Sequence, residues 1–114
     1  MTDRLSIALA QSNASVGNLR ANADAMLAQR AAAGDADLLV TPELSLIGYP
    51  PEDLVLKPAA VAACAEELDR LAQATATPGP AMLVGLPWRE DGKLYNAMAL
   101  PDGGRIAAIT KKHD

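Results

Sequence analysis

The sequence of 114 residues predicts an α/β fold in which a mixed β-sheet carries helices on one of its faces. In the first half of the chain, strand-like and helix-like segments alternate, which is typical of right-handed crossovers between parallel strands. In the second half, three strand-like segments follow one another through short turns, which adds antiparallel strands to the sheet. The length allows one ordinary hydrophobic core and no second domain.

The first half begins with a strand and a helix. In residues 5–12, LSIALAQS, large apolar residues alternate with small ones, which predicts a strand packed on at least one face. Residues 18–33 predict an amphipathic helix, because a start signal at Asn18 and a stop signal at Gly34 enclose apolar residues at helical spacing. Those apolar residues are Leu19, Ala23, Met26, Leu27 and Ala31.

A second strand and a second helix follow. Residues 37–41, DLLVT, end in a continuous apolar run that is typical of a strand covered on both faces, and Pro42 ends that strand. Proline is tolerated in the first turn of a helix, and an apolar stripe from Pro58 to about Thr75 predicts the second helix. The stripe consists of Val61, Cys64, Leu68, Leu71 and Ala72.

The second half predicts a run of antiparallel strands. The strands are residues 81–88, 93–100 and 105–110, with tight turns at residues 90–92 and 101–104. The sequence stops four residues after the last of these strands, without a further helix to cover it. We therefore expect residues 1–114 to be the first part of a larger domain.

Charge and composition exclude several classes of function. The net charge of −4 and the absence of a basic block argue against a nucleic-acid partner or an anionic membrane surface. The N-terminal residues resemble neither a signal peptide nor a membrane span, so we expect a cytoplasmic protein. A single cysteine, Cys64, and a single histidine, His113, exclude a disulfide framework and a two-histidine metal site.

Glu43 is the first candidate for chemistry. It lies just beyond the predicted strand 37–41, and in open α/β sheets ligands bind beyond the carboxyl ends of the strands. Partial desolvation at such a place suits a general base. The alternative interpretation, from position alone, is a glutamate that caps a turn or faces water.

Four sequence blocks together resemble the nitrilase superfamily, the carbon-nitrogen hydrolases. TPELSLIGYPPEDL resembles the glutamate motif of the family, and AMLVGLPW, KLYNAMAL and GRIAAITKKHD resemble the three strand segments that follow, in the same order. The resemblance implies a four-layer α-β-β-α sandwich, of which these residues would form the first half. It also implies a catalytic set of glutamate, lysine and cysteine.

The resemblance implies roles for particular residues. Glu43 would be the general base, and Lys112 would stabilise the negative charge of the tetrahedral intermediate. Lys111 would point to the opposite side of an extended segment, as a solvated surface charge. Tyr49 would line the substrate pocket and hold the Glu43 loop in place.

The cysteine of the catalytic set is not among these residues. In the family it follows a later strand, so we expect it beyond Asp114 and expect residues 1–114 alone to be inactive. Cys64 lies on the apolar stripe of the second helix, where a small buried thiol is a core residue rather than a nucleophile.

The extension GYPPEDL resembles, more narrowly, glutaminase domains that supply ammonia to a synthetase domain in the same protein. The implied substrates are glutamine here and, in the other domain, ATP with Mg²⁺ and nicotinic acid adenine dinucleotide, in a homo-oligomer. No cofactor or metal is expected within residues 1–114, which lack a phosphate-binding loop. Two alternatives remain: a stand-alone amidase of the same superfamily, and an α/β binding module in which Glu43 and Lys112 are surface charges.

Overall fold

The structure is a computed structural model that describes residues 4–10 and 15–112. Its elements, in chain order, are β1 (Ile7–Leu9), α1 (Leu19–Ala33), β2 (Leu38–Val40), the 3₁₀-helix η1 (Glu52–Leu56), α2 (Pro58–Ala74), β3 (Ala81–Glu90), β4 (Lys93–Asp102) and β5 (Arg105–Lys112). The predicted order of strands and helices is confirmed. The 3₁₀-helix was not predicted.

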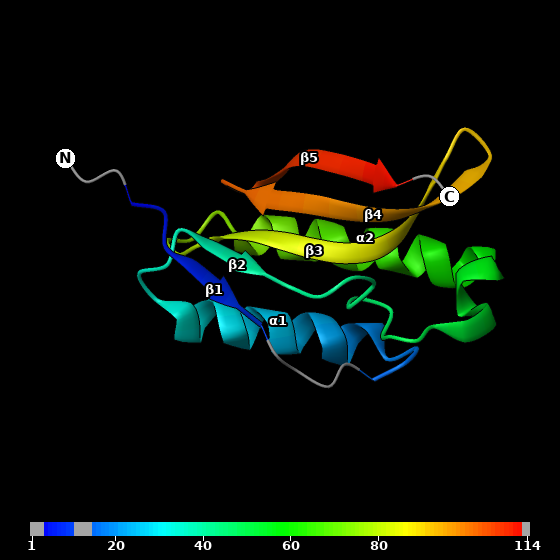
Figure 1. The fold of residues 1–114 in the computed structure, drawn as a ribbon, viewed down its shortest axis with the longest axis horizontal. Coiled ribbons are helices and arrows are strands. Elements are labelled where there is room, and N and C mark those ends of the chain that lie inside the picture. Colours follow the sequence, from blue (N-terminus) through cyan, green and yellow to red (C-terminus); the bar gives the residue numbers. More distant parts are fainter. Residues whose placement is uncertain (1–3, 11–14, 113–114) are drawn as a thin grey trace.

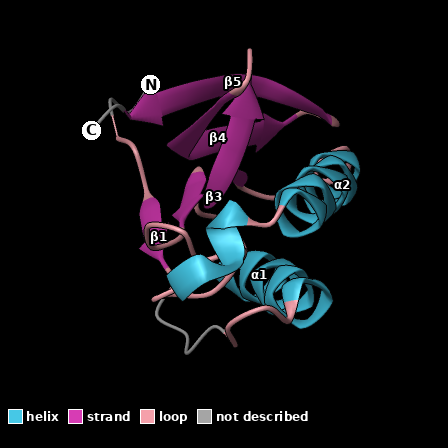
Figure 2. Ribbon diagram, turned by 90° about the vertical axis from the view of Figure 1, so that its right-hand side faces the viewer, coloured by secondary structure: helices cyan, strands magenta, loops and turns pink. Residues whose placement is uncertain are grey.

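One five-stranded sheet contains all the strands, in the order in which they occur along the chain. β1, β2 and β3 are parallel, whereas β3, β4 and β5 pair antiparallel, so the sheet is mixed as predicted. The helices α1 and α2 lie side by side on one face of it (Figures 1 and 2). Within the described residues, no helix is long and apolar enough to cross a membrane.

The core lies between the two helices and the face of the sheet that they cover. Leu39 of β2 and Met82, Val84 and Leu86 of β3 point toward the helices, and each is at most 2% exposed. The stripe predicted for α2 is confirmed, because all five of its residues are buried. Burial of one leucine side chain contributes about 1.5–3 kcal/mol, so this layer dominates the stability of the fold.

The buried face of α1 differs from the predicted one. Ala31 is exposed, and the buried set instead includes two polar residues, Asn22 and Arg30. Arg30 is 7% exposed, and its guanidinium donates hydrogen bonds to carbonyl oxygens at the C-terminal end of α2 and before β3. The acceptors are the carbonyls of Pro80 at 2.8 Å, Thr77 at 2.7 Å and Ala74 at 3.2 Å. The negative end of the helix dipole therefore lies beside this buried cation.

The other face of the sheet is not covered by any described helix or strand. β2 was predicted to be covered on both faces, but Leu38 and Val40 are only half-buried, because the helices pack on one face alone. On the same uncovered side, Leu5, Ile7 and Leu9 are 68%, 50% and 69% exposed. Of the predicted strand 5–12, the structure assigns only Ile7–Leu9, and residues 11–14 lie outside the described part.

The antiparallel strands are longer than predicted. β3 extends to Glu90, so the first turn comprises Asp91 and Gly92. β4 extends to Asp102, and its pairing with β5 contains a register shift at Leu100/Pro101, where β5 holds one extra residue. This bulge sets which side chains of β5 face the helices beyond it.

We expect residues 1–114, prepared alone, to self-associate through the uncovered face. Exposed apolar strands with a free edge favour intermolecular contacts, and replacing Ile7 and Leu9 by threonine removes much of that apolar surface. The apparent mass in size-exclusion chromatography with light scattering should therefore fall in the double variant. Equal association by parent and variant would contradict a role for this face.

The matched control is Leu39→Thr on the neighbouring strand. Leu39 is 2% exposed and faces the helices, so its replacement should unfold the domain, at a cost of about 2–5 kcal/mol, and should not reduce association.

Candidate active site

The turn that carries Glu43 crosses the carboxyl end of the sheet on its uncovered side. It lies directly on Gly85 of β3: a Cβ atom added there would be 2.5 Å from the carbonyl oxygen of Pro42 and 2.6 Å from the amide nitrogen of Leu44. Such distances are shorter than the contacts that Cβ atoms make with atoms they are not bonded to. Glycine at this place in the strand therefore allows the backbone on either side of Glu43 to contact β3.

The hydroxyl of Thr41 connects this turn to the sheet. Its Oγ1 donates to the carbonyl of Leu83 at 2.9 Å and accepts from the amide of Gly85 at 3.2 Å and from the hydroxyl of Ser45 at 2.9 Å. The amide of Leu46 then donates to the carbonyl of Gly85 at 3.0 Å. Polar groups of the turn thus take the place of β2 along β3, and no backbone group of Gly85 is left unpaired.

The conformation of the turn fixes the direction of Glu43. Leu44 has φ of +55°, a left-handed conformation that costs a non-glycine residue about 1–2 kcal/mol. Two backbone hydrogen bonds close the turn, from Ser45 to Pro42 at 3.2 Å and from Gly48 to Leu44 at 3.0 Å. Glu43 is exposed, and its carboxylate accepts no hydrogen bond from the described residues. Its position therefore depends on the backbone of the turn.

Lys112 ends β5 on the same face and at the same edge of the sheet. It pairs with Asn96 of β4, which pairs with Pro87 of β3, two residues beyond Gly85. With strands about 4.8 Å apart and about 3.4 Å per residue, the backbone of Lys112 lies about 12 Å from that of Gly85. The fold therefore brings Glu43 and Lys112 to one surface, although no ion pair joins them in the described structure.

Lys111 faces the helix side of the sheet, as predicted from strand alternation, but it is not simply solvated. Its ammonium group pairs with the carboxylate of Glu90 and lies 5.8 Å from the ring centroid of Tyr95. The hydrogen bond from Lys111 lowers the pKa of Glu90, and the same contact raises the pKa of Lys111. Lys111 is exposed at the surface, as predicted, and its pairing with Glu90 was not foreseen, because it depends on how far β3 extends.

Tyr49 lies in the loop after the turn and is 64% exposed. The short 3₁₀-helix that follows contains Asp53, which is exposed. Lys57 is the N-cap of α2 and makes no side-chain capping hydrogen bond. His113 lies outside the described residues.

A cavity of about 110 Å³ lies between α1 and the turn, on the helix side. Thr41, Pro42 and Ser45 line it, together with Asn22 of α1. None of the three predicted site residues does. The cavity is therefore not lined by Glu43, whose backbone lies against Gly85 on the uncovered side.

Cys64 is fully buried on α2, which agrees with its interpretation as a core residue. Burial raises the pKa of its thiol to about 12, so almost no thiolate is present near neutral pH. In the part of the chain that the structure describes, no three side chains of His, Cys, Asp or Glu converge to hold a metal ion.

The sequence and the fold agree with one family of hydrolases. Residues 6–114 match the model of the carbon-nitrogen hydrolase family, and the chain belongs to that family. Within it, the chain is similar to glutamine-dependent NAD(+) synthetases: it is 43% identical to that of Rhodobacter capsulatus over 99% of its length. It spans about a fifth (21%) of that relative.

Solved structures show the same fold. The glutamine-dependent NAD(+) synthetase of Acinetobacter baumannii, solved in complex with ADP, aligns with 96% of the chain and 21% of its own, with a TM-score of 0.79 and 33% identity. A variant amidase from Nesterenkonia sp. AN1, with acrylamide added at its active-site cysteine, aligns with 97% of the chain and 45% of its own, with a TM-score of 0.78 and 25% identity.

Two residues of this arrangement were not predicted. Thr41 was expected only to end a strand, and Gly85 was noted only as part of the block AMLVGLPW, without a role at the site. A glycine inside an apolar strand does signal close approach of another backbone, so LVGLP contained a usable signal. For Thr41 no comparable signal exists, because its partners in β3, Leu83 and Gly85, lie more than forty residues away.

Gly85→Ala should destabilise the protein by about 1–3 kcal/mol, the usual cost of overpacking, because the new methyl group must displace the turn at Glu43. Urea unfolding measures the change. Ala81→Val, on the same face of β3 but away from the turn, is the control and should change stability by less than about 0.5 kcal/mol. Equal stability of the Gly85 variant and its parent would contradict the close packing described here.

Proposed function

We propose that residues 1–114 belong to the glutaminase domain of a glutamine-dependent NAD(+) synthetase, in which Glu43 and Lys112 are catalytic. The observation that carries the proposal is the 43% identity to such an enzyme over almost the whole chain. The position of both side chains at one edge and on one face of the sheet supports it. Because the relatives are several times longer, the nucleophilic cysteine is assigned to residues beyond those given.

The proposed chemistry is hydrolysis of the glutamine side-chain amide through a thioester. Glu43 accepts the proton of the cysteine thiol, and the thiolate attacks the amide carbon. Lys112 stabilises the oxyanion, which collapses and expels ammonia with the proton held by Glu43. Glu43 then takes a proton from water as it attacks the thioester, which releases glutamate and restores the thiol. Tyr49 forms part of the wall of the glutamine pocket.

The released ammonia would serve a synthetase domain. That domain would use ATP and Mg²⁺ to amidate nicotinic acid adenine dinucleotide, and the solved relative with bound ADP supports a nucleotide site there. The alternative within the family, a stand-alone amidase, has weaker support, because the amidase is 25% identical to this chain. A binding module outside the family has the weakest support, because residues 6–114 match the model of a hydrolase family.

The cellular setting is part of the proposal. An enzyme that consumes ATP works where ATP is made and kept, which favours the cytoplasm. The buried, protonated Cys64 thiol requires no oxidising compartment. We also propose a homo-oligomer, which native mass spectrometry of the full-length protein would test.

Glu43→Gln in the full-length protein should lower glutamine hydrolysis by at least about 10²-fold, because the amide cannot accept the thiol proton. NAD formation from added ammonium should persist, since that reaction bypasses the glutaminase site. Release of glutamate and formation of NAD are measured in parallel. Undiminished hydrolysis of glutamine would exclude Glu43 as the base and favour the binding-module alternative.

Lys112→Met should lower the kcat of glutamine hydrolysis by about 10²–10³-fold, as loss of a charge-stabilising group does. Lys111→Met is the matched control: it removes an adjacent lysine whose ammonium faces the helix side and pairs with Glu90. The control should retain kcat within about threefold. Equal losses in both variants would contradict the assignment of Lys112.

A further inference from the structure

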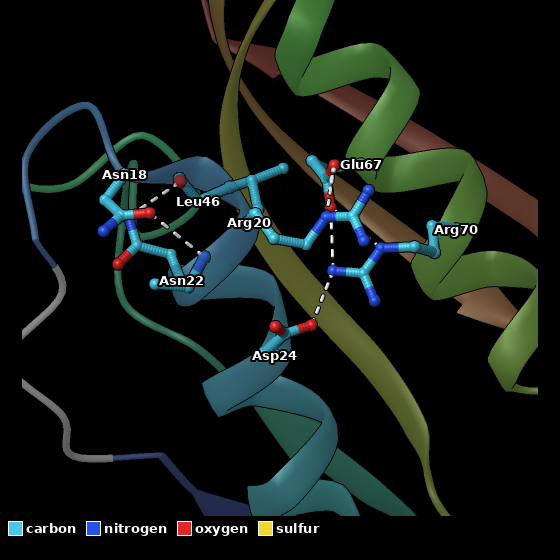
Figure 3. Close-up of polar contacts among 8 residues, drawn as sticks. Asn18, Arg20, Asn22, Asp24, Leu46, Glu67 and Arg70 are labelled. Carbon is cyan, nitrogen blue, oxygen red and sulfur yellow. Dashed lines mark hydrogen bonds and ion pairs between the residues drawn. The ribbon is translucent and has the colours of Figure 1, made fainter.

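The first turn of α1 contacts the Glu43 turn through a buried side chain. Asn22 is 5% exposed, and its Nδ2 donates to the carbonyl of Leu46 at 3.0 Å and to that of Ser15 at 2.7 Å. Its Oδ1 accepts from the amide of Ser15 at 2.9 Å. Figure 3 shows Asn22 directed from the helix toward Leu46. Both amide protons and the carbonyl oxygen of this side chain are thus used.

Both backbone groups of Leu46, its amide and its carbonyl, are hydrogen-bonded. Its amide donates to the carbonyl of Gly85 in β3, and its carbonyl accepts from Asn22 in α1. Leu46 lies three residues after Glu43, inside the same turn. Because it is fully buried, these hydrogen bonds are shielded from water and are costly to lose. Asn22 therefore fixes the turn from the helix side, while β3 fixes it from the sheet side.

A second contact runs in parallel with the one from Asn22. The amide of Gly17 donates to the carbonyl of Ile47 at 2.8 Å. Gly48 approaches so closely that an added Cβ would be 2.6 Å from the Cα of Val16. The segment before α1 and the end of the Glu43 turn are therefore packed backbone to backbone, and Asn22 bonds to both through Ser15 and Leu46.

The packing of α1 on α2 does not require Asn22. Other polar residues near the N-terminus of α1 make the contacts within the helix and between the helices. Asn18 accepts a hydrogen bond from the amide of Ala21, whereas Arg20 and Asp24 of α1 pair with Glu67 and Arg70 of α2 (Figure 3). These contacts lie on the exposed side of the helices. A change at Asn22 alone thus leaves these contacts of the helix pair in place and acts on the turn and on the segment before α1 that packs against it.

We propose that Asn22 is a positioning residue for Glu43: by holding the carbonyl of Leu46, it fixes the conformation of the turn from which the exposed Glu43 side chain projects. The inference rests on the proposed function of Glu43. The carboxylate accepts no hydrogen bond from described residues, so among them only the backbone of the turn restricts where Glu43 can reach. A shift of about 1 Å in such a group lowers a reaction rate by about 10²-fold.

The test uses the full-length protein and Asn22→Asp. Aspartate keeps the shape and the acceptor for the Ser15 amide, but it places an oxygen against the carbonyls of Leu46 and Ser15, which both accept from Asn22. The kcat of glutamine hydrolysis should fall about 10- to 100-fold while KM changes less than about threefold. NAD formation from ammonium should be unchanged. Asn18→Ala, on the same helix but without contact to the turn, is the control and should keep the kcat of its parent.

A double-mutant cycle separates positioning from a merely structural role. If Asn22 acts through Glu43, Asn22→Asp should cause little further loss in a Glu43→Asp background, where the carboxylate is already displaced. Full additivity of the two losses, or an unchanged kcat in the single variant, would overturn the inference. If Asn22→Asp does not fold, as judged by its melting temperature and ammonium-dependent activity, Asn22→Ser replaces it in the same cycle.

The cycle also distinguishes this inference from the proposed function. Loss of hydrolysis in Glu43→Gln together with full activity in the Asn22 variants would overturn the positioning role alone. Full activity in Glu43→Gln would overturn the assignment of the base, and the positioning role with it.

Discussion

β2 ends early, so the backbone of the neighbouring strand β3 needs other hydrogen-bond partners beyond that point. The turn that carries Glu43 supplies them, and its conformation follows from this requirement. β2 has three residues, whereas β3 has ten. The hydroxyl of Thr41 and the amide of Leu46 bond to β3 where the missing residues of β2 would have done so. The turn is consequently an extension of the sheet rather than a free loop. An exposed carboxylate can thus be held on a rigid backbone without a partner of its own.

Much of the fold follows from patterns that are local in the sequence. The stripe of α2 and the start of α1 at Asn18 depend on spacing and capping within a few residues, and both are confirmed. The buried polar residues Asn22 and Arg30 could not be predicted, because their partners are carbonyl groups that come near only after folding. Half-burial of β2 was also missed: a continuous apolar run does not show whether one face or two faces are covered.

Part of the candidate site was also predictable from patterns that are local in the sequence. Strand alternation assigned Lys111 and Lys112 to opposite faces, and the register agrees. The position of Glu43 beyond a strand was also predictable from the apolar run and the proline. The ion pair of Lys111 with Glu90 was not, since it depends on how far β3 extends past its apolar part. Residues that position a site through distant partners, rather than forming it, are the hardest to predict from a sequence.

The bulge between β4 and β5 has a consequence for which lysine reaches the site. Beyond it, the side chains of β5 alternate without interruption to Lys112. One residue added to or removed from the strand after the bulge would turn the strand over, so that Lys111 would occupy the uncovered face and Lys112 the helix side. The number of residues between the bulge and the end of β5, a strand of eight residues, therefore determines which of the two lysines faces the uncovered side. Insertions that are harmless in most surface hairpins would here exchange one ammonium group for another.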